Sequence, residues 1–281
     1  MQIFRKKNAL IHCLSFTKLK KERIGFVPTM GALHKGHISL VDISKKQNHI
    51  TVVSIFVNPT QFDNPDDLKK YPNTIEKDLS LLEKSNCDVV YIPTVDDLYP
   101  KDVVSNYFSF GGIEHQMEGA FRKGHFDGVA TVIQSFFQIV TPTNAYFGEK
   151  DFQQLQIVKQ LVKNKSLPIS IVGCPIFREK DGLAMSSRNL RLTTDQRATA
   201  PFVYKTLQLA KKQLATNSLE KVENFVQDAF SNHTELELEY FTIADEESLV
   251  RATTVHPNKK YRAFIAVFAG EIRLIDNISI S

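Results

Sequence analysis

The chain has 281 residues, 42% of them hydrophobic and 23% charged, with a formal net charge of +4. This is an ordinary composition for a globular protein with a sizeable core, so it excludes a disordered chain, and the length suits two domains. The lysines are spread along the chain, so a solvated surface explains the charge better than a nucleic-acid partner does.

The cysteines and the N-terminal stretch give no sign of export. Cys13, Cys87 and Cys174 are far apart and odd in number, which argues against a disulfide framework and a cysteine zinc site. Residues 1–16 lack the uninterrupted apolar core of a secretory signal, and no window approaches the ~20 apolar residues that span a bilayer. We therefore expect a cytosolic protein with no membrane partner.

Strand-like and helix-like segments alternate through the first two thirds of the chain. Apolar runs predict strands, and apolar residues three or four apart predict helices. Asn73 is expected to cap the second helix, with Glu76 completing a capping box. The alternation predicts βαβ units in a doubly wound parallel sheet, an α/β fold. The predicted strands are 24–28, 51–57, 88–92, 144–147 and 169–172, and the helices are 37–46, 73–84, 127–140 and 151–163.

The pattern changes after Gly173. Residues 174–193 are mostly polar and basic, and we place a domain boundary inside this stretch. The part that follows reads as a smaller α+β domain, so the predicted division is 1–176 and 177–281. Its predicted helices are 195–216 and 219–231, and its predicted strands are 237–243, 261–269 and 272–275.

The strongest local signal is the turn that leaves the first strand, Pro-Thr-Met-Gly-Ala-Leu-His-Lys-Gly-His, residues 28–37. Ligands of open α/β sheets bind at the carboxyl ends of strands, and a helix N-terminus attracts phosphate. His34 and His37 can donate hydrogen bonds to phosphate oxygens. A metal site, two surface histidines and an ordinary turn remain alternatives. The glycine spacing fits neither a Walker loop nor G-x-G-x-x-G.

Three further polar clusters follow predicted strands or the domain boundary. Gln61, after the second strand, carries an amide that can donate to a carboxylate. Lys150 supplies a mobile positive charge suited to phosphate, and residues 185–189 supply two hydroxyls and a guanidinium. Taken singly, each cluster has an equally good structural explanation. The segment with Gln61 can be a polar loop, Asp151 can be a helix cap, and residues 185–189 can be a basic linker. Their convergence on one sheet edge predicts a binding cleft.

Together the four clusters resemble the pantothenate synthetase family, the pantoate–β-alanine ligases of the His-x-Gly-His nucleotidyltransferase superfamily. The likeness runs from about residue 25 to 191 and includes 118–129. It implies a Rossmann-like N-terminal domain, a C-terminal lid domain and a homodimer. It also implies a two-step reaction with ATP and Mg²⁺. Pantoate first forms pantoyl adenylate and pyrophosphate, and β-alanine then gives pantothenate and AMP.

The resemblance also implies roles for individual residues. His37, His34, Lys150 and Arg188 would be catalytic, with His37 chiefly an electrostatic donor. Gln61 and Gln154 would bind pantoate, and Gln61 would also lie at the β-alanine site. No metal ligand can be assigned, and Asp78 is only a weak candidate. The ATP-binding residues would be Met30, Gly31, Ala32, Leu33, His34, Lys35, Gly36, His37, Gly148, Glu149, Lys150, Asp151, Phe177, Met185, Ser186, Ser187 and Arg188.

Some positions depart from the family pattern, and two other functions stay open. The departures are Asp63 for a common Gly, Asn73 for Arg, and Ser135, Phe136 and Gln138 for Lys, Leu and Asn. A different nucleotidyltransferase, coupling CTP or ATP to a phosphorylated substrate, would need a phosphate site in place of the two neutral glutamines. An RNA-binding module would need a basic stripe with stacking aromatics, which the sequence does not show.

Overall fold

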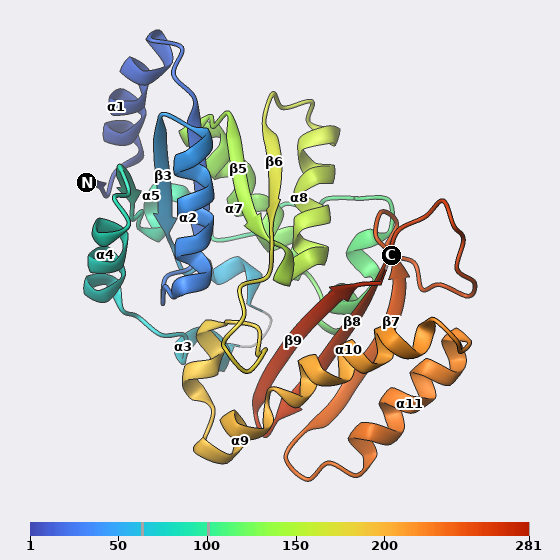
Figure 1. The fold of residues 1–281 in the computed structure, drawn as a ribbon. Coiled ribbons are helices and arrows are strands. Elements are labelled where there is room, and N and C mark those ends of the chain that lie inside the picture. Colours follow the sequence, from blue (N-terminus) through green and yellow to red (C-terminus); the bar gives the residue numbers. More distant parts are fainter. Residues whose placement is uncertain (63–64, 100–101, 281) are drawn as a thin grey trace. The chain divides into compact units, whose positions relative to one another are not determined.

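The structure is a computed structural model that describes residues 1–62, 65–99 and 102–280. The chain forms two compact units (Figure 1). The first contains Met1–Glu149 and Gln153–Pro175, and the second contains Lys150–Phe152 and Ile176–Ser281. Three residues, Lys150–Phe152, therefore group with the second unit although the chain on both sides of them belongs to the first. The separate functions expected for 1–176 and 177–281 stay a prediction.

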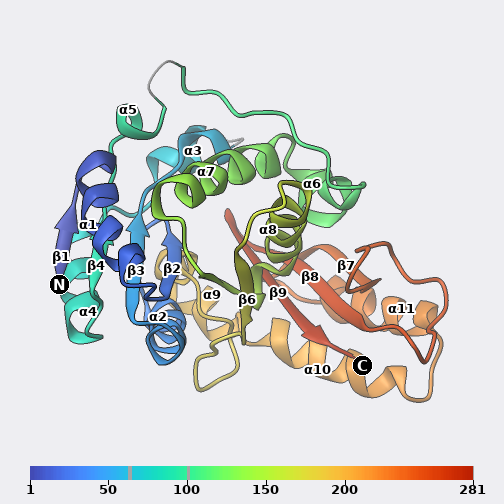
Figure 2. The ribbon, with the colours of Figure 1, turned by 90° about the horizontal axis from the view of Figure 1, so that it is seen from above.

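A six-stranded parallel sheet forms the centre of the first unit (Figure 2). Its strand order is β1-β4-β3-β2-β5-β6, so the order reverses between β2 and β5. Ligand sites of doubly wound sheets lie at such a reversal, outside the carboxyl ends of the strands. The predicted fold class is confirmed. The strands are β1 (Gln2–Phe4), β2 (Ile24–Thr29), β3 (Ile50–Ile55), β4 (Val89–Tyr91), β5 (Asn144–Gly148) and β6 (Ser170–Cys174).

Helices cover both faces of this sheet. Alternate strand residues point to opposite faces, so Val27 packs with Val41 and Leu82 on the side of α2 (Lys35–Gln47) and α4 (Ile75–Lys84). Phe26 points the other way and packs edge-on against Phe136 of α7 (His125–Val140). Helix α1 (Lys7–Leu19) contacts α7. The unit also contains α3 (Pro65–Lys69), α5 (Val95–Leu98), α6 (Met117–Phe121), α8 (Phe152–Asn164, from Gln153 on), η1 (Pro59–Gln61) and η2 (Ile113–His115).

The N-terminus of α4 differs from the prediction. The helix begins at Ile75 with Thr74 as its N-cap residue, so the expected cap at Asn73 and the capping box with Glu76 are wrong. Thr74 makes no side-chain cap, because its hydroxyl donates to the buried carboxylate of Asp78 at 3.1 Å. This helix end is therefore organised around Asp78.

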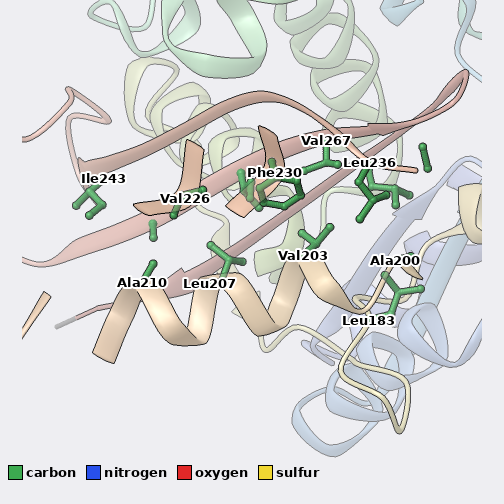
Figure 3. Packing of buried hydrophobic residues seen from close by; sticks show 14 of the residues in the cluster. Leu183, Ala200, Val203, Leu207, Ala210, Val226, Phe230, Leu236, Ile243 and Val267 are labelled. Atoms are coloured by element: carbon green, nitrogen blue, oxygen red, sulfur yellow. The ribbon is translucent and has the colours of Figure 1, made fainter. Parts of the chain in front are cut away.

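The second unit is an antiparallel sheet backed by two helices. The sheet has the order β7-β8-β9, with β7 (Glu237–Asp245), β8 (Tyr261–Ala269) and β9 (Ile272–Ser279). Helices α10 (Phe202–Leu214) and α11 (Leu219–Ser231) pack on it (Figure 3). Their apolar residues recur at helical spacing and form one core with the strands. That core includes Val203, Leu207, Ala210, Val222, Val226, Phe230, Ile243, Ile265 and Val267.

The single helix predicted over 195–216 is wrong. The chain instead forms α9 (Thr194–Thr199) and α10, which are separated at Ala200 and Pro201. A proline inside a helix lacks the amide hydrogen and its ring clashes with the preceding turn, so it breaks the helix. The unit also holds the 3₁₀ helix η4 (Ser187–Arg191), while η3 (Glu149–Asp151) joins the units. Within the described ranges, no helix combines the length and the apolar character needed to cross a membrane.

Candidate active site

The histidine turn follows β2 and is held in place by Asp78. Gly31 has a φ of +84° and Ala32 a φ of +50°, so the chain turns sharply through left-handed backbone. The Asp78 carboxylate accepts hydrogen bonds from Ala32 N at 2.9 Å and Leu33 N at 2.7 Å. Asp78 is fully buried. Its oxygens are thus committed to the turn, so Asp78 is a structural anchor and no longer a candidate metal ligand.

The two histidines lie one above the other at the start of α2. Their ring centroids are 4.0 Å apart, with planes tilted by 35°. The backbone N–H of His34 donates to His37 Nδ1 at 3.3 Å. A nitrogen that accepts cannot carry the proton of the neutral ring, so neutral His37 carries it on Nε2. His37 can therefore donate through Nε2, away from its own backbone.

Gln61 belongs to a buried network of amides and hydroxyls. Its side-chain oxygen accepts from Asn58 Nδ2 at 3.2 Å, and its Nε2 donates to the sulfur of Met30 at 2.9 Å. Asn58 also donates to Gly128 O at 3.1 Å and accepts from Tyr99 O–H at 2.7 Å. Burial raises the pKa of Tyr99, which keeps it a donor. Because a thioether is a weak acceptor, a substrate oxygen can replace Met30 as the partner of Gln61.

His125 and Arg122, for which the sequence indicated no role, support the same loop. His125 Nδ1 lies 2.8 Å from Gln61 O, and its Nε2 lies 3.1 Å from Arg122 Nη1. A carbonyl only accepts and a guanidinium only donates, so the proton of His125 is on Nδ1 and the ring is neutral. Gly128 permits this packing, since a Cβ there would lie 2.2 Å from Thr60 O. The only signal in the sequence was the family likeness over 118–129.

Two adjacent glutamines at the start of α8 have different environments. Gln153 is buried, donates to Ile113 O at 2.8 Å and Gln116 O at 2.7 Å, and accepts from Glu118 N at 3.0 Å. Gln154 is only half-buried. Gln153 is therefore structural, and the role of Gln154 in binding pantoate stays a prediction. Gly148 ends β5, the neighbour of β2, and Glu149 follows it, so both lie at the same sheet edge as the histidine turn.

The remaining predicted residues lie in the second unit. Lys150 Nζ is 3.6 Å from Asp151 Oδ1, and the Lys150 side chain is 18% exposed. Phe177 and Met185 face each other across a short hairpin, where Met185 N donates to Phe177 O at 2.9 Å. Ser186 caps η4, accepting from Arg188 N at 3.3 Å. The Phe177 carbonyl thus accepts a hydrogen bond within the hairpin, and the expected contact between the Phe177 backbone and an adenine stays a prediction.

The departures from the family pattern fall mostly on packing or surface positions. Phe136 is buried and packs against Phe26, and Gln138 and Asn73 are exposed. Ser135 donates to Thr131 O at 3.1 Å within α7. Asp63 lies outside the described residues. In the described ranges, no group of three or more His, Cys, Asp or Glu side chains is arranged to hold a metal ion.

Comparisons with known proteins agree with the resemblance seen in the sequence. A family model described as pantoate-beta-alanine ligase matches residues 2–279. The chain is similar over its whole length to the pantothenate synthetases of Christiangramia forsetii, at 51% identity over 282 residues, and Flavobacterium psychrophilum, at 52% over 281 residues. Both alignments cover 100% of both chains.

Two solved structures are similar at 36% sequence identity. The pantothenate synthetase of Thermus thermophilus matches with a TM-score of 0.92, covering 100% of this chain and 99% of that one. The pantoate-beta-alanine ligase of Francisella tularensis, complexed with beta-gamma ATP and beta-alanine, matches with a TM-score of 0.83, covering 100% of this chain and 98% of that one.

Proposed function

The chain belongs to the pantoate–β-alanine ligase family, and on that premise we propose that it joins pantoate to β-alanine through a pantoyl-adenylate intermediate. ATP is the activating substrate. AMP and pyrophosphate are the by-products. The observation that carries the proposal is the histidine turn, which Asp78 holds beside the strand-order reversal between β2 and β5.

In the first step the pantoate carboxylate attacks the α-phosphate of ATP. A P–O bond forms to the carboxylate as the bond to pyrophosphate breaks, and negative charge collects on the departing oxygens. His37 donates through Nε2 to an oxygen of the α-phosphate, and His34, Lys150 and Arg188 neutralise the pyrophosphate. Fixed donors aimed at developing charge are among the largest contributions to catalysis.

We propose that Gln61 and Gln154 hold pantoate. A neutral amide donates to a carboxylate and accepts from a hydroxyl, which matches a hydroxy acid. The buried network through Asn58, His125 and Arg122 fixes the loop that carries Gln61. Positioning of this kind lowers the entropic part of the barrier, because the reactants meet in line.

In the second step the amine of β-alanine attacks the acyl carbon of the adenylate. A C–N bond forms, the amine loses a proton, and the bond from the acyl carbon to the phosphate oxygen breaks, so AMP departs with the electron pair of that bond. Gln61 lies near the β-alanine site in this proposal.

The ATP site is made by Met30–His37, Gly148–Asp151, Phe177 and Met185–Arg188. Residues 1–176 would bind nucleotide and pantoate, and residues 177–281 would form a lid.

The residues present suit Mg²⁺ delivered with ATP. Magnesium at nucleotide sites is held largely by phosphate oxygens and water, with few protein ligands. Asp78 is unsuitable, since its carboxylate accepts from Ala32 N and Leu33 N. When bound, the ion would neutralise phosphate charge alongside Lys150 and Arg188. The homodimer and the cytoplasmic location are further parts of the proposal.

Pantoate-dependent exchange of labelled pyrophosphate into ATP tests the intermediate. The proposal predicts exchange with ATP, Mg²⁺ and pantoate alone, and pantothenate with AMP once β-alanine is added. Exchange that needs β-alanine would reject the adenylate. Turnover of a phosphorylated alcohol with CTP or ATP, and none of pantoate, would favour the other nucleotidyltransferase. That alternative needs a phosphate-binding site where Gln61 and Gln154 lie, and neutral amides carry no charge to bind phosphate.

A further inference from the structure

The segment Lys150–Phe152 is held by the C-terminal sheet. Asn277 Nδ2, on β9, donates to Lys150 O at 2.9 Å. The Arg262 guanidinium, on β8, lies 4.1 Å from the centre of the Phe152 ring, and the rings of Phe152 and Phe264 are 5.9 Å apart. These three contacts explain why this short segment groups with the second unit.

The orientation of the Asn277 amide is determined by its partners. Arg262 Nη1 donates to Asn277 Oδ1 at 2.6 Å, and a guanidinium has no acceptor. The carbonyl of Lys150 has no donor, so only the NH₂ end of Asn277 can face it. Asn277 is 2% exposed. Water therefore does not compete effectively for either bond, and the amide is a fixed link between Arg262 and the Lys150 backbone.

The neighbouring residue Asp276 holds the same part of β9 from the other side. Arg178 donates to both oxygens of Asp276, at 2.6 and 2.9 Å, and to Asn277 O at 3.2 Å. The backbone N–H of Asn277 donates to Asp276 Oδ1 at 2.7 Å. A bidentate ion pair of this kind has a defined geometry. The backbone of Arg178 also forms an isolated antiparallel β-bridge with Ala184, one residue before Met185.

We propose that Asn277 is a positioning residue for Lys150, which it fixes through the Lys150 backbone; this inference rests on the proposed role of Lys150 at the ATP phosphates. A lysine is a point charge on a flexible stem, so its placement depends on a fixed main chain. Asp276, the neighbour of Asn277 on β9, also holds Arg178. Arg178 belongs to the hairpin that precedes Arg188. The segment that carries Lys150 and the hairpin that precedes Arg188 are thus held by one connected set of contacts.

The substitution Asn277→Asp removes the link with little change in size. The new carboxylate still accepts from Arg262, but an oxygen now faces Lys150 O in place of an NH₂ group. We expect kcat of pantoate-dependent exchange to fall at least ~10-fold, since misplacements of ~1 Å can cost ~10²-fold. The KM for β-alanine should stay within about twofold of the wild-type value. Asn217→Asp is the control, because Asn217 Nδ2 donates to Gln213 O at 3.1 Å outside the proposed site.

A double-mutant cycle with Lys150→Ala separates positioning from general damage. If Asn277 acts through Lys150, adding Asn277→Asp to Lys150→Ala changes the rate by less than about twofold. Equal losses in both backgrounds would overturn the inference, as would wild-type exchange in Asn277→Asp. Should the Asp variant melt below the assay temperature, Asn277→Ser replaces it, and the same two outcomes decide. A wild-type chain without exchange would instead reject the proposed function.

Discussion

Replacing Asp78 by Asn tests whether this carboxylate holds the histidine turn. Asp78 accepts from Ala32 N, Leu33 N and the Thr74 hydroxyl, and it is fully buried. An amide of the same size keeps one acceptor and places an NH₂ group against a backbone N–H. One charged hydrogen bond is lost, about 1.5–3 kcal/mol, and a buried donor is left unpaired, about 1–3 kcal/mol. We expect the unfolding free energy to fall by about 2.5–6 kcal/mol.

The assays are calorimetric unfolding and pantoate-dependent pyrophosphate exchange. For a unit of this size, 1 kcal/mol corresponds to roughly 2–4 °C, so the midpoint should fall by about 5–24 °C. Below that midpoint, displacement of the turn should slow exchange by about 10²-fold. Asp42→Asn makes the same change at an exposed position of α2 and should leave both quantities unaltered. A wild-type midpoint together with a wild-type rate in Asp78→Asn would refute this role.

Three further substitutions probe the site. His37→Ala should lower the exchange rate by about 10²–10³-fold with little change in the unfolding midpoint, since lost transition-state donors typically cost that much; near-normal exchange would contradict the assigned role. Gln61→Ala should raise the KM for pantoate more than the KM for ATP in initial-rate measurements, and the reverse order would contradict it. Gly128→Ala should lower the midpoint in calorimetry, although alanine favours helices by about 1 kcal/mol, because its Cβ would lie 2.2 Å from Thr60 O; a raised midpoint would show that α7 can move.

Local periodicity was sufficient to predict five of the six strands of the parallel sheet, β2 to β6. Its strands are apolar runs bounded by polar turns, and such runs alternate with amphipathic helices. The first two elements were missed. β1 has only three residues, and its formation depends on pairing with β4 rather than on its own sequence. The break at Pro201 was visible in the sequence, because a proline lacks the amide hydrogen that a helix interior needs, yet the prediction ran one helix through it.

The local motifs of the site were predictable, and the contacts that support them were not. Asp78 lies 45 and 46 residues from the amides it holds, His125 lies 64 residues from Gln61, and Asn277 lies 127 residues from Lys150. None of these pairs leaves a periodic trace, because each depends on how separate elements pack. A sequence therefore indicates which groups do the chemistry more readily than which groups hold them.

A crystal structure with a non-hydrolysable ATP analogue and pantoate tests most directly whether the four motifs form one pocket. The account predicts His37 Nε2 within about 3 Å of an α-phosphate oxygen, with Lys150 and Arg188 on the outer phosphates and Gln61 and Gln154 on pantoate. A nucleotide bound away from His37, or one whose phosphates meet neither Lys150 nor Arg188, would contradict it.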